Sequence, residues 1–487
     1  MRIADVRGAG GRNSRRGDQG EQQSPPRKST PEHRPPSEGS QMTAHAPRPI
    51  LRTFDIVSLI VGTVVGAGIY KTPALVAGMV HSDAGLLAFW ALGGLLSILG
   101  ALCYAELAST FPDTGGEYHF LRLAWGPRIA FLYAWSRSTV IVTGSIAMLA
   151  ITFGDYISPL LPLGPHSTYW WAATITVLLS GINALGVHKA RAAQTLFLGV
   201  AVIAIVAIVI AGLRAHGAAT GAAPAPDSGG SLGGSLGLVM VFVLLTYGGW
   251  NEAAYISAEA RDARRGVLRG LVLGLGAVTL FYLAANFAYL HGLGRDAVAA
   301  SATPAADLFR VAYGPGSSTV IALIVAVSCM KSVNATIFFG ARSNFALGRD
   351  WKTFRWLDGW HESGAPRRAI LVQMVVALAL IGLATLTRNG FAAMVEFTAP
   401  VFWLFILMVA LALFRLRRRY PDRERPFRVP GYPVVPALFA ANAAWLLWSS
   451  VSYTGLGAAV GVAFLILGLV PLALEARRRD PPSYRSR

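Results

Sequence analysis

The sequence predicts an all-α membrane protein of twelve transmembrane helices. It further predicts a five-plus-five inverted repeat in which helices 1 and 6 are unwound near their midpoints. Three observations support these predictions: the composition, the number of long apolar runs, and two glycine clusters within the first and sixth runs. Of 487 residues, 54% are hydrophobic and only 14% are charged, and the mean hydropathy is +0.49. This composition is too apolar for a soluble fold and is typical of a polytopic membrane protein.

The span count comes from apolar runs of about 20 residues, the length that crosses a bilayer as a helix. In the membrane domain, residues 51–475, repeat one covers about 54–213, repeat two about 235–415, and helices 11 and 12 about 434–475. The twelve runs lie near residues 54–80, 84–110, 127–153, 167–186, 190–213, 235–258, 267–291, 316–347, 368–387, 391–415, 434–453 and 455–475.

The two ends of the chain are polar and basic. Residues 1–50 are rich in Arg, Pro, Ser, Gly and Gln, with almost no large apolar residues, which predicts a disordered basic tail. Residues 476–487 form a second basic tail. Met42 stands just before the membrane domain, and we interpret it as a candidate for the true initiator.

The positions of Lys and Arg test the span count independently. If the chain has twelve spans, basic residues fall on every second connection between spans, and 36 of the 43 Lys and Arg residues lie on the same side of the membrane as the N-terminus. By the positive-inside rule, both termini are expected in the cytoplasm. The net charge of +18 is then explained by topology and by attraction to the anionic inner leaflet, so no nucleic-acid partner is predicted.

The first span contains the first glycine cluster, Gly66-Ala67-Gly68-Ile69, which follows Thr63. Glycine weakens a helix where the bilayer offers no water to the freed backbone groups, so those groups must face a protein-lined cavity. Main-chain N–H groups at such a break suit a carboxylate. The alternative is close helix packing through small residues four apart, Gly62 and Gly66.

The sixth span contains the second cluster, in which adjacent glycines permit a break whose carbonyls could accept an ammonium group. Together the two breaks fit a zwitterionic α-amino acid and indicate a transporter built from inverted repeats. Tyr247 and Trp250 are candidate walls or gates over the substrate side chain, the alternative being lipid or core packing. The candidate binding residues of this cluster are Leu245, Tyr247, Gly248, Gly249, Trp250 and Asn251.

These motifs resemble those of the amino acid/polyamine/organocation (APC) superfamily, in particular its L-type amino acid transporter branch. The similarity covers about residues 50–475 and includes the loop Phe111–Tyr118 and the segment Arg425–Pro433. It implies the LeuT-like fold, with spans 1–5 mirrored by spans 6–10 and the substrate held where spans 1 and 6 unwind.

Two positions depart from the pattern of that branch. Leu245 stands where an aromatic gate is common, and Ala201 stands where many members carry a lysine in span five that replaces a sodium ion. Lys331, near the centre of span eight, is too deep for its ammonium to reach the interface. We interpret Lys331 as the replacement cation beside span one. For Arg137, in span three, the resemblance implies a structural hydrogen-bonding role.

The sequence therefore predicts a secondary active transporter, a permease or an exchanger, for neutral L-amino acids. It is expected to be independent of sodium and to work without ATP, cofactor or metal ion. A polyamine or amine permease and a non-transporting amino acid sensor remain alternatives. A membrane enzyme is disfavoured because the nine histidines are scattered over the tail, the loops and the span ends.

The expected surroundings are the lipid bilayer of a bacterial inner membrane. Animal members of the resembled branch pair with a heavy chain through a cysteine in the loop after span three. The corresponding loop here, near residues 154–167, contains no cysteine, so no disulfide-linked heavy chain is expected. The two cysteines, Cys103 and Cys329, both lie inside apolar runs.

Overall fold

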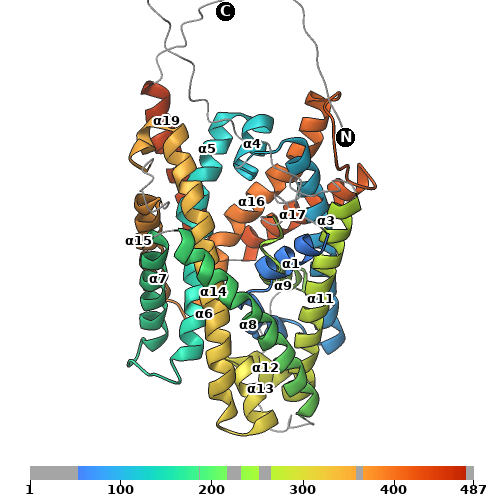
Figure 1. Ribbon diagram of the computed structural model, residues 1–487, viewed down its shortest axis with the longest axis vertical. Helices are drawn as coiled ribbons and strands as arrows, with labels where there is room; N and C mark the ends of the chain where they lie inside the picture. Colours follow the sequence, from blue (N-terminus) through green and yellow to red (C-terminus); the bar gives the residue numbers. More distant parts are fainter. Residues whose placement is uncertain are drawn as a thin grey trace, which may run out of the picture. The chain divides into compact units, whose positions relative to one another are not determined.

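The computed structural model describes residues 53–113, 115–185, 187–215, 232–251, 265–357, 366–453 and 455–478. These residues form helices and their connections, with no strand in the described ranges. The predicted N-terminal tail, residues 1–50, and residues 479–487 of the C-terminal tail lie outside them. Figure 1 shows the helices of residues 46–487, most of them running close to the long axis of the picture.

Each predicted span corresponds to a helix or to a broken helix in the structure. Eight helical stretches within the described residues are long and apolar enough to cross a membrane, and two shorter apolar helices, Gly199–Arg214 and Leu236–Thr246, belong to the fifth and sixth spans. In span order the elements are α1 (Thr53–Val64), η1 (Ala67–Tyr70) and α2 (Thr72–Met79); α3 (Asp83–Thr110); α5 (Pro127–Ser136), η2 (Arg137–Ile141) and α6 (Val142–Ile157); α7 (Ser167–Leu185); α8 (Val187–Arg214); α9 (Leu232–Thr246); α11 (Arg265–Leu293); α14 (Ser317–Asp350); α15 (Arg367–Ala384); α16 (Gly390–Arg419); α17 (Val434–Tyr453); and α18 (Gly455–Leu467) with α19 (Leu469–Arg478).

Short helices occupy the connections. α4 (Glu117–Trp125) joins the second and third spans, α12 (Arg295–Ala300) and α13 (Pro304–Tyr313) join the seventh and eighth, and η4 (Lys352–Leu357) follows the eighth. α4 begins after Gly116, whose φ is +51°, and ends at Gly126, whose φ is +94°. Glycine adopts this left-handed region without the steric cost that a Cβ would add, so these two residues set both ends of α4.

Helices from the two predicted repeats pack together in mirrored pairs. α3 contacts α11, α6 contacts α14, α7 contacts α15, and α2 contacts α9. These pairs join spans 2 and 7, 3 and 8, 4 and 9, and 1 and 6, which are the equivalent spans of two inverted halves. The architecture is that of the predicted APC-type membrane fold.

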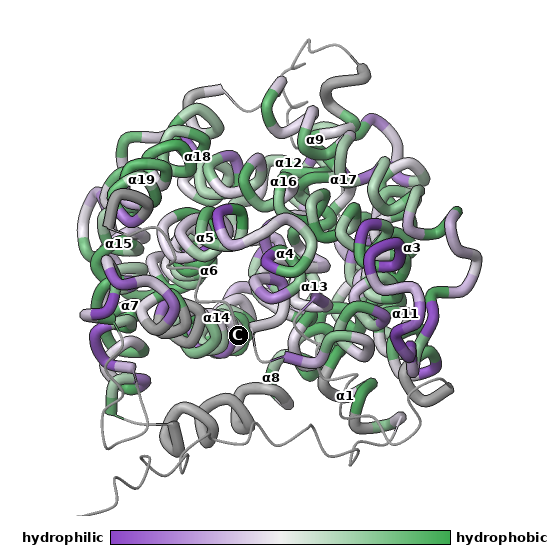
Figure 2. The backbone as a smooth tube through the Cα atoms, turned by 90° about the horizontal axis from the view of Figure 1, so that it is seen from above, coloured by the Kyte–Doolittle hydropathy of each residue, from purple (hydrophilic) through white to green (hydrophobic). Residues whose placement is uncertain are grey.

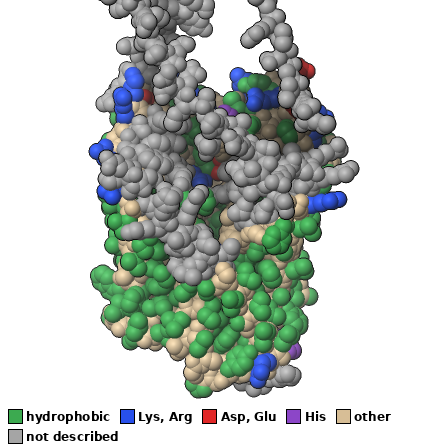
Figure 3. Space-filling view, viewed as in Figure 1, with side chains coloured by type: hydrophobic (Ala, Val, Ile, Leu, Met, Phe, Trp, Pro, Cys, Tyr) green, Lys and Arg blue, Asp and Glu red, His purple; other side chains and the backbone are tan. Residues whose placement is uncertain are grey.

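The outer surface of the helices is apolar. Large hydrophobic side chains are exposed on several helices, such as Leu280 (69% exposed), Ile203 (60%) and Val375 (60%). Figure 3 shows many hydrophobic side chains on the part of the flank that is not drawn in grey, and Figure 2 shows hydrophobic residues along many of the helices. In water such a surface would be unfavourable, whereas in a bilayer it meets lipid.

Connections that carry basic residues meet at one end of the helices. Arg122 on α4 lies 3.6 Å from Asp350 at the end of α14, and Arg419 at the end of α16 donates to the carbonyl of Leu123 at 3.2 Å. Figure 3 shows Lys and Arg gathered near the upper end of the view. The connections between spans 2 and 3, 8 and 9, and 10 and 11 therefore share one end of the described structure, which we call the basic end.

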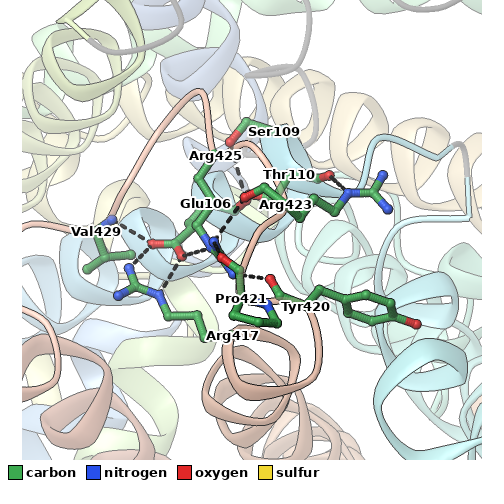
Figure 4. A network of polar contacts seen from close by, with 9 residues as sticks. All are labelled: Glu106, Ser109, Thr110, Arg417, Tyr420, Pro421, Arg423, Arg425 and Val429. Carbon is green, nitrogen blue, oxygen red and sulfur yellow. Dashed lines mark hydrogen bonds and ion pairs between the residues drawn. The ribbon is translucent and has the colours of Figure 1, made fainter.

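A buried carboxylate organises part of the basic end (Figure 4). Glu106, near the end of α3, is 1% exposed and accepts both Nε (2.6 Å) and Nη2 (2.5 Å) of Arg417 at the end of α16. Its Oε2 also accepts the N–H of Val429 at 2.7 Å. A buried charge is tolerated when it is fully paired and hydrogen-bonded. This pairing anchors the segment Arg425–Pro433, noted in the sequence, over the ends of two transmembrane helices.

Candidate functional site

The first span is broken between Val64 and Thr72. α1 ends at Val64, Gly66 adopts an extended conformation (φ −135°, ψ −168°), and one 3-10 turn precedes α2. Pro73 stands in the first turn of α2, where a missing N–H costs nothing because that group has no partner within the helix. Gly62 remains inside α1, so the break is made by Gly66 and the residues after it.

The sixth span is broken immediately after Thr246. α9 ends there, Tyr247–Gly249 form a turn, and helical backbone resumes at Trp250 and Asn251. Gly249 has φ +105°, a conformation that side-chain-bearing residues rarely adopt. Residues 252–264 lie outside the described residues.

The two breaks lie directly against each other. A Cβ on Gly249 would lie 2.9 Å from the carbonyl oxygen of Thr63, and a Cβ on Gly68 would lie 2.9 Å from Cγ2 of Thr246. The hydroxyl of Tyr282, on α11, lies within hydrogen-bond distance of the carbonyls of Val64 (2.9 Å) and Thr246 (3.2 Å), shares its one hydrogen between them, and so joins the ends of α1 and α9. The neighbouring atom belongs to the main chain at Gly249 and to the side chain of Thr246 at Gly68, so an added Cβ at either position would force a shift.

A cavity of about 210 Å³ lies at the breaks. Nine of the twelve candidate residues line it. At Gly66, Gly68, Gly248 and Gly249 the chain presents only its main chain to the cavity, because glycine has no side chain. The nine are Thr63, Gly66, Ala67, Gly68, Leu245, Gly248, Gly249, Asn251 and Lys331.

The side chains of Ile69, Tyr247 and Trp250 do not line this cavity. Ile69 is fully buried in the core, the hydroxyl of Tyr247 donates to the carbonyl of Trp90 at 2.9 Å, and Trp250 packs edge-on against Tyr104. In this structure Tyr247 and Trp250 occupy the packing role that was the alternative to a wall or gate. Their rings hold the second break against α3, on which Trp90 and Tyr104 lie.

Lys331 lies at the first break. Its side chain is buried, at 2% exposure, and Nζ donates to the carbonyl of Val65 at 2.8 Å. Carbonyls at the C-terminal end of a helix have no partner in the helix and carry partial negative charge, so a cation is favourable there. Ala201 on α8 is also buried, and its methyl side chain offers no ammonium at the position where the resemblance leads one to expect lysine.

The rest of the cavity wall is mostly apolar. Within the described residues, the lining includes two cations, Arg137 and Lys331, and no carboxylate. Hydroxyl groups of Ser145, Thr336 and Thr398 add weaker polar contacts. The apolar side chains come from α6, α9, α14 and α16, and include Met148, Leu149, Phe242, Phe339, Phe391, Val395 and Phe402.

Arg137 reaches the cavity from η2, a π-helical turn in the third span. Such wide turns often mark functional sites because they redirect a side chain. Nη1 of Arg137 lies 3.5 Å from Oε2 of Glu117 and donates to the hydroxyl of Tyr133 at 3.2 Å. The predicted hydrogen-bonding role of Arg137 agrees with these contacts, and the residue also lines the cavity.

Glu117 is the residue that sequence reasoning missed. It begins α4 and is 5% exposed. Its carboxylate accepts hydrogen bonds from Tyr104, Tyr133, Arg137 and Asn251. The available signal was its place at the end of the loop motif Phe111–Tyr118, but spacing alone does not reveal partners on four other segments.

A second cavity, of about 360 Å³, lies toward the other end of the first break. Lys71, between η1 and α2, extends into its wall and pairs with Asp155 on α6 at 2.5 Å. The same ammonium donates to the carbonyl of Ala302, in the joint between α12 and α13, at 3.0 Å. These contacts tie the C-terminal half of the broken span to the helices around it.

Membrane helices with two opposed breaks around a buried cavity are the architecture of secondary transporters. The match of residues 51–474 to the amino acid permease family shows that the chain belongs to that family. The protein is thus an amino acid transporter of the membrane and not an enzyme.

Characterised relatives cover most of this chain. The rat b(0,+)-type amino acid transporter 1 is 28% identical over 393 residues, which are 78% of this chain and 79% of the rat protein. The human protein of that name is 27% identical over 398 residues, 80% of each chain. The human large neutral amino acids transporter small subunit 2 is 28% identical over 430 residues, covering 84% of this chain and 78% of its own length.

Proposed function

We propose that this protein transports neutral L-α-amino acids by alternating access and is independent of sodium. The substrate carboxylate binds the main-chain N–H groups around Gly66–Gly68, and the ammonium group binds carbonyls around Tyr247–Gly249. The observation that carries this proposal is the convergence of both glycine breaks on one cavity of about 210 Å³. Because the main chains of both breaks border one cavity, the site suits a ligand that carries an acceptor group and a donor group on the same carbon atom, as an α-amino acid does.

The apolar wall and the charges of the cavity support a neutral substrate. A polyamine or a cationic side chain would need carboxylates to receive it, and the described lining residues include none. Burial of an apolar substrate side chain against Met148, Phe242 and Phe391 makes the free energy of binding more favourable. Among the relatives, one is named for large neutral amino acids, which agrees with this preference.

The position of Lys331 supports independence from sodium. Broken helices in transporters commonly bind the coupling cation through unwound backbone carbonyls. Here the ammonium of Lys331 lies 2.8 Å from the carbonyl of Val65. Because the ammonium of Lys331 already occupies the position beside this carbonyl, no sodium ion is needed there.

For the surroundings, we propose a cell membrane, specifically a bacterial inner membrane, with the basic end and both termini in the cytoplasm. The clustering of Arg122, Arg419 and Arg423 at one end supports this orientation under the positive-inside rule. The relative named as a small subunit raises the question of a partner chain. Both cysteines of the sequence, Cys103 and Cys329, are buried in the structure, so we propose that no disulfide joins this chain to a heavy chain.

Flux of a labelled neutral amino acid into proteoliposomes tests the proposal. We expect uptake that is equal when sodium is replaced by choline. Binding without flux would instead identify a sensor. Strict dependence of the flux on sodium would contradict the role proposed for Lys331.

A further inference from the structure

Arg137 is one of the residues that line the cavity, and its carboxylate partner Glu117 is not. The two side chains are 14% and 6% exposed, and the closest atoms are 3.5 Å apart. The cavity wall therefore includes a cationic residue whose carboxylate partner is not itself part of that wall.

The position of Glu117 is fixed by groups from four segments. Oε1 accepts the hydroxyl of Tyr104 at 2.9 Å and the amide of Asn251 at 3.2 Å, and Oε2 accepts the hydroxyl of Tyr133 as well as Arg137. Four donors on one carboxylate hold it in one position and satisfy its acceptor sites. Its negative charge is thus held in a fixed place beside the cavity, where the surrounding protein screens charge much less than water does.

We propose that Glu117 is a specificity-determining residue, which keeps the cavity selective for neutral side chains by balancing the charge of Arg137. This inference rests on the proposed function, because it concerns the charge of the substrate in that same cavity. With the pair intact, an anionic side chain finds no free cation at Arg137, and a cationic side chain finds no free carboxylate at Glu117. Each partner alone would favour a substrate of the opposite charge.

The test removes each charge separately and measures the preference for charge. The wild-type protein and the variants Glu117→Gln and Arg137→Gln are each reconstituted into proteoliposomes. Inhibition of labelled leucine uptake is then measured with pairs of competitors that are similar in size. Glutamate is compared with glutamine, and lysine with norleucine. Glu117→Gln is expected to raise the potency of glutamate relative to glutamine by at least about tenfold, the smallest effect that an opposite charge within about 4–6 Å has on an ionisation equilibrium.

Arg137→Gln is expected to shift the preference in the opposite direction, toward lysine relative to norleucine. The double variant Glu117→Gln with Arg137→Gln restores the preference for neutral competitors. Tyr133→Phe is the control, because it removes a hydrogen bond to the same carboxylate without changing any charge, and its selectivity stays that of the wild type.

The outcomes separate this inference from the proposed function. If wild-type protein transports leucine but both single variants change only the rate, with unchanged ratios between the paired competitors, the pair has a structural role and the inference is wrong. If one of the two single variants does not fold, the other still tests the inference, because each variant is expected to shift the charge preference in its own direction. Absence of leucine transport by folded wild-type protein would instead contradict the proposed function.

Discussion

Replacing Gly249 by alanine is expected to reduce amino acid transport by at least about tenfold. The residue has φ +105°, where an L-residue costs about 1–2 kcal/mol. The added Cβ would also lie 2.9 Å from the carbonyl oxygen of Thr63, so the two breaks would have to separate. An increase of about 1.4 kcal/mol in a barrier or in a binding free energy already corresponds to tenfold. Initial rates of leucine uptake in proteoliposomes measure the effect.

The matched control is Gly276→Ala. Gly276 lies within α11, and a Cβ there would meet no atom within 4 Å. Alanine is the better helix former, so this variant should transport at the wild-type rate and keep its stability. Wild-type uptake by Gly249→Ala, at equal amounts of folded protein, would show that close approach of the two breaks is not needed for transport.

Lys331→Met is expected to reduce transport by about 10- to 100-fold. The change keeps an unbranched apolar side chain but removes the ammonium that donates to the carbonyl of Val65 at 2.8 Å. Hydrogen bonds to charged groups contribute about 1.5–3 kcal/mol, which corresponds to this range. Without the fixed cation, the end of α1 is no longer held against α14, and the geometry of the first break is lost.

Cys329→Ala is the control for this variant. Cys329 is buried on the same helix but does not line the cavity, so its loss should leave the uptake rate close to that of the wild type. Uptake is measured in sodium and in choline for both variants, and size-exclusion profiles confirm that each protein is folded. Full transport activity of Lys331→Met in choline would show that Lys331 is not needed for the transport mechanism.

The sequence predicted the features that depend on local physics. A long apolar run predicts a helix in a bilayer whatever lies around it. The glycines at 66, 68, 248 and 249 predict weak points in their helices because the effect of glycine on helix stability is local to its own backbone. The structure shows both breaks within a few residues of these glycines. The break of the first span begins after Gly62, since a single glycine can remain in a helix when its backbone hydrogen bonds are kept.

The features that depend on partners far apart in the sequence were left open or were missed. An aromatic residue beside a break can face the substrate or pack against a neighbouring helix, and both uses have the same local pattern. Tyr247 contacts Trp90, 157 residues away, which no spacing rule predicts. Glu117 was passed over for the same reason, because α4 lies outside the apolar runs while its carboxylate is buried against three other segments and the cavity residue Asn251.

The most direct measurement of the central claim is competition by analogues that lack one charged group of the substrate. Leucine, its decarboxylated amine and its deaminated acid are compared as inhibitors of labelled leucine uptake by the wild-type protein. Because the first break is assigned to the carboxylate and the second to the ammonium, leucine is predicted to inhibit and both analogues to be at least about tenfold weaker, the equivalent of one lost interaction of about 1.4 kcal/mol. Inhibition by the amine as strong as that by leucine would contradict this assignment and would favour an amine permease.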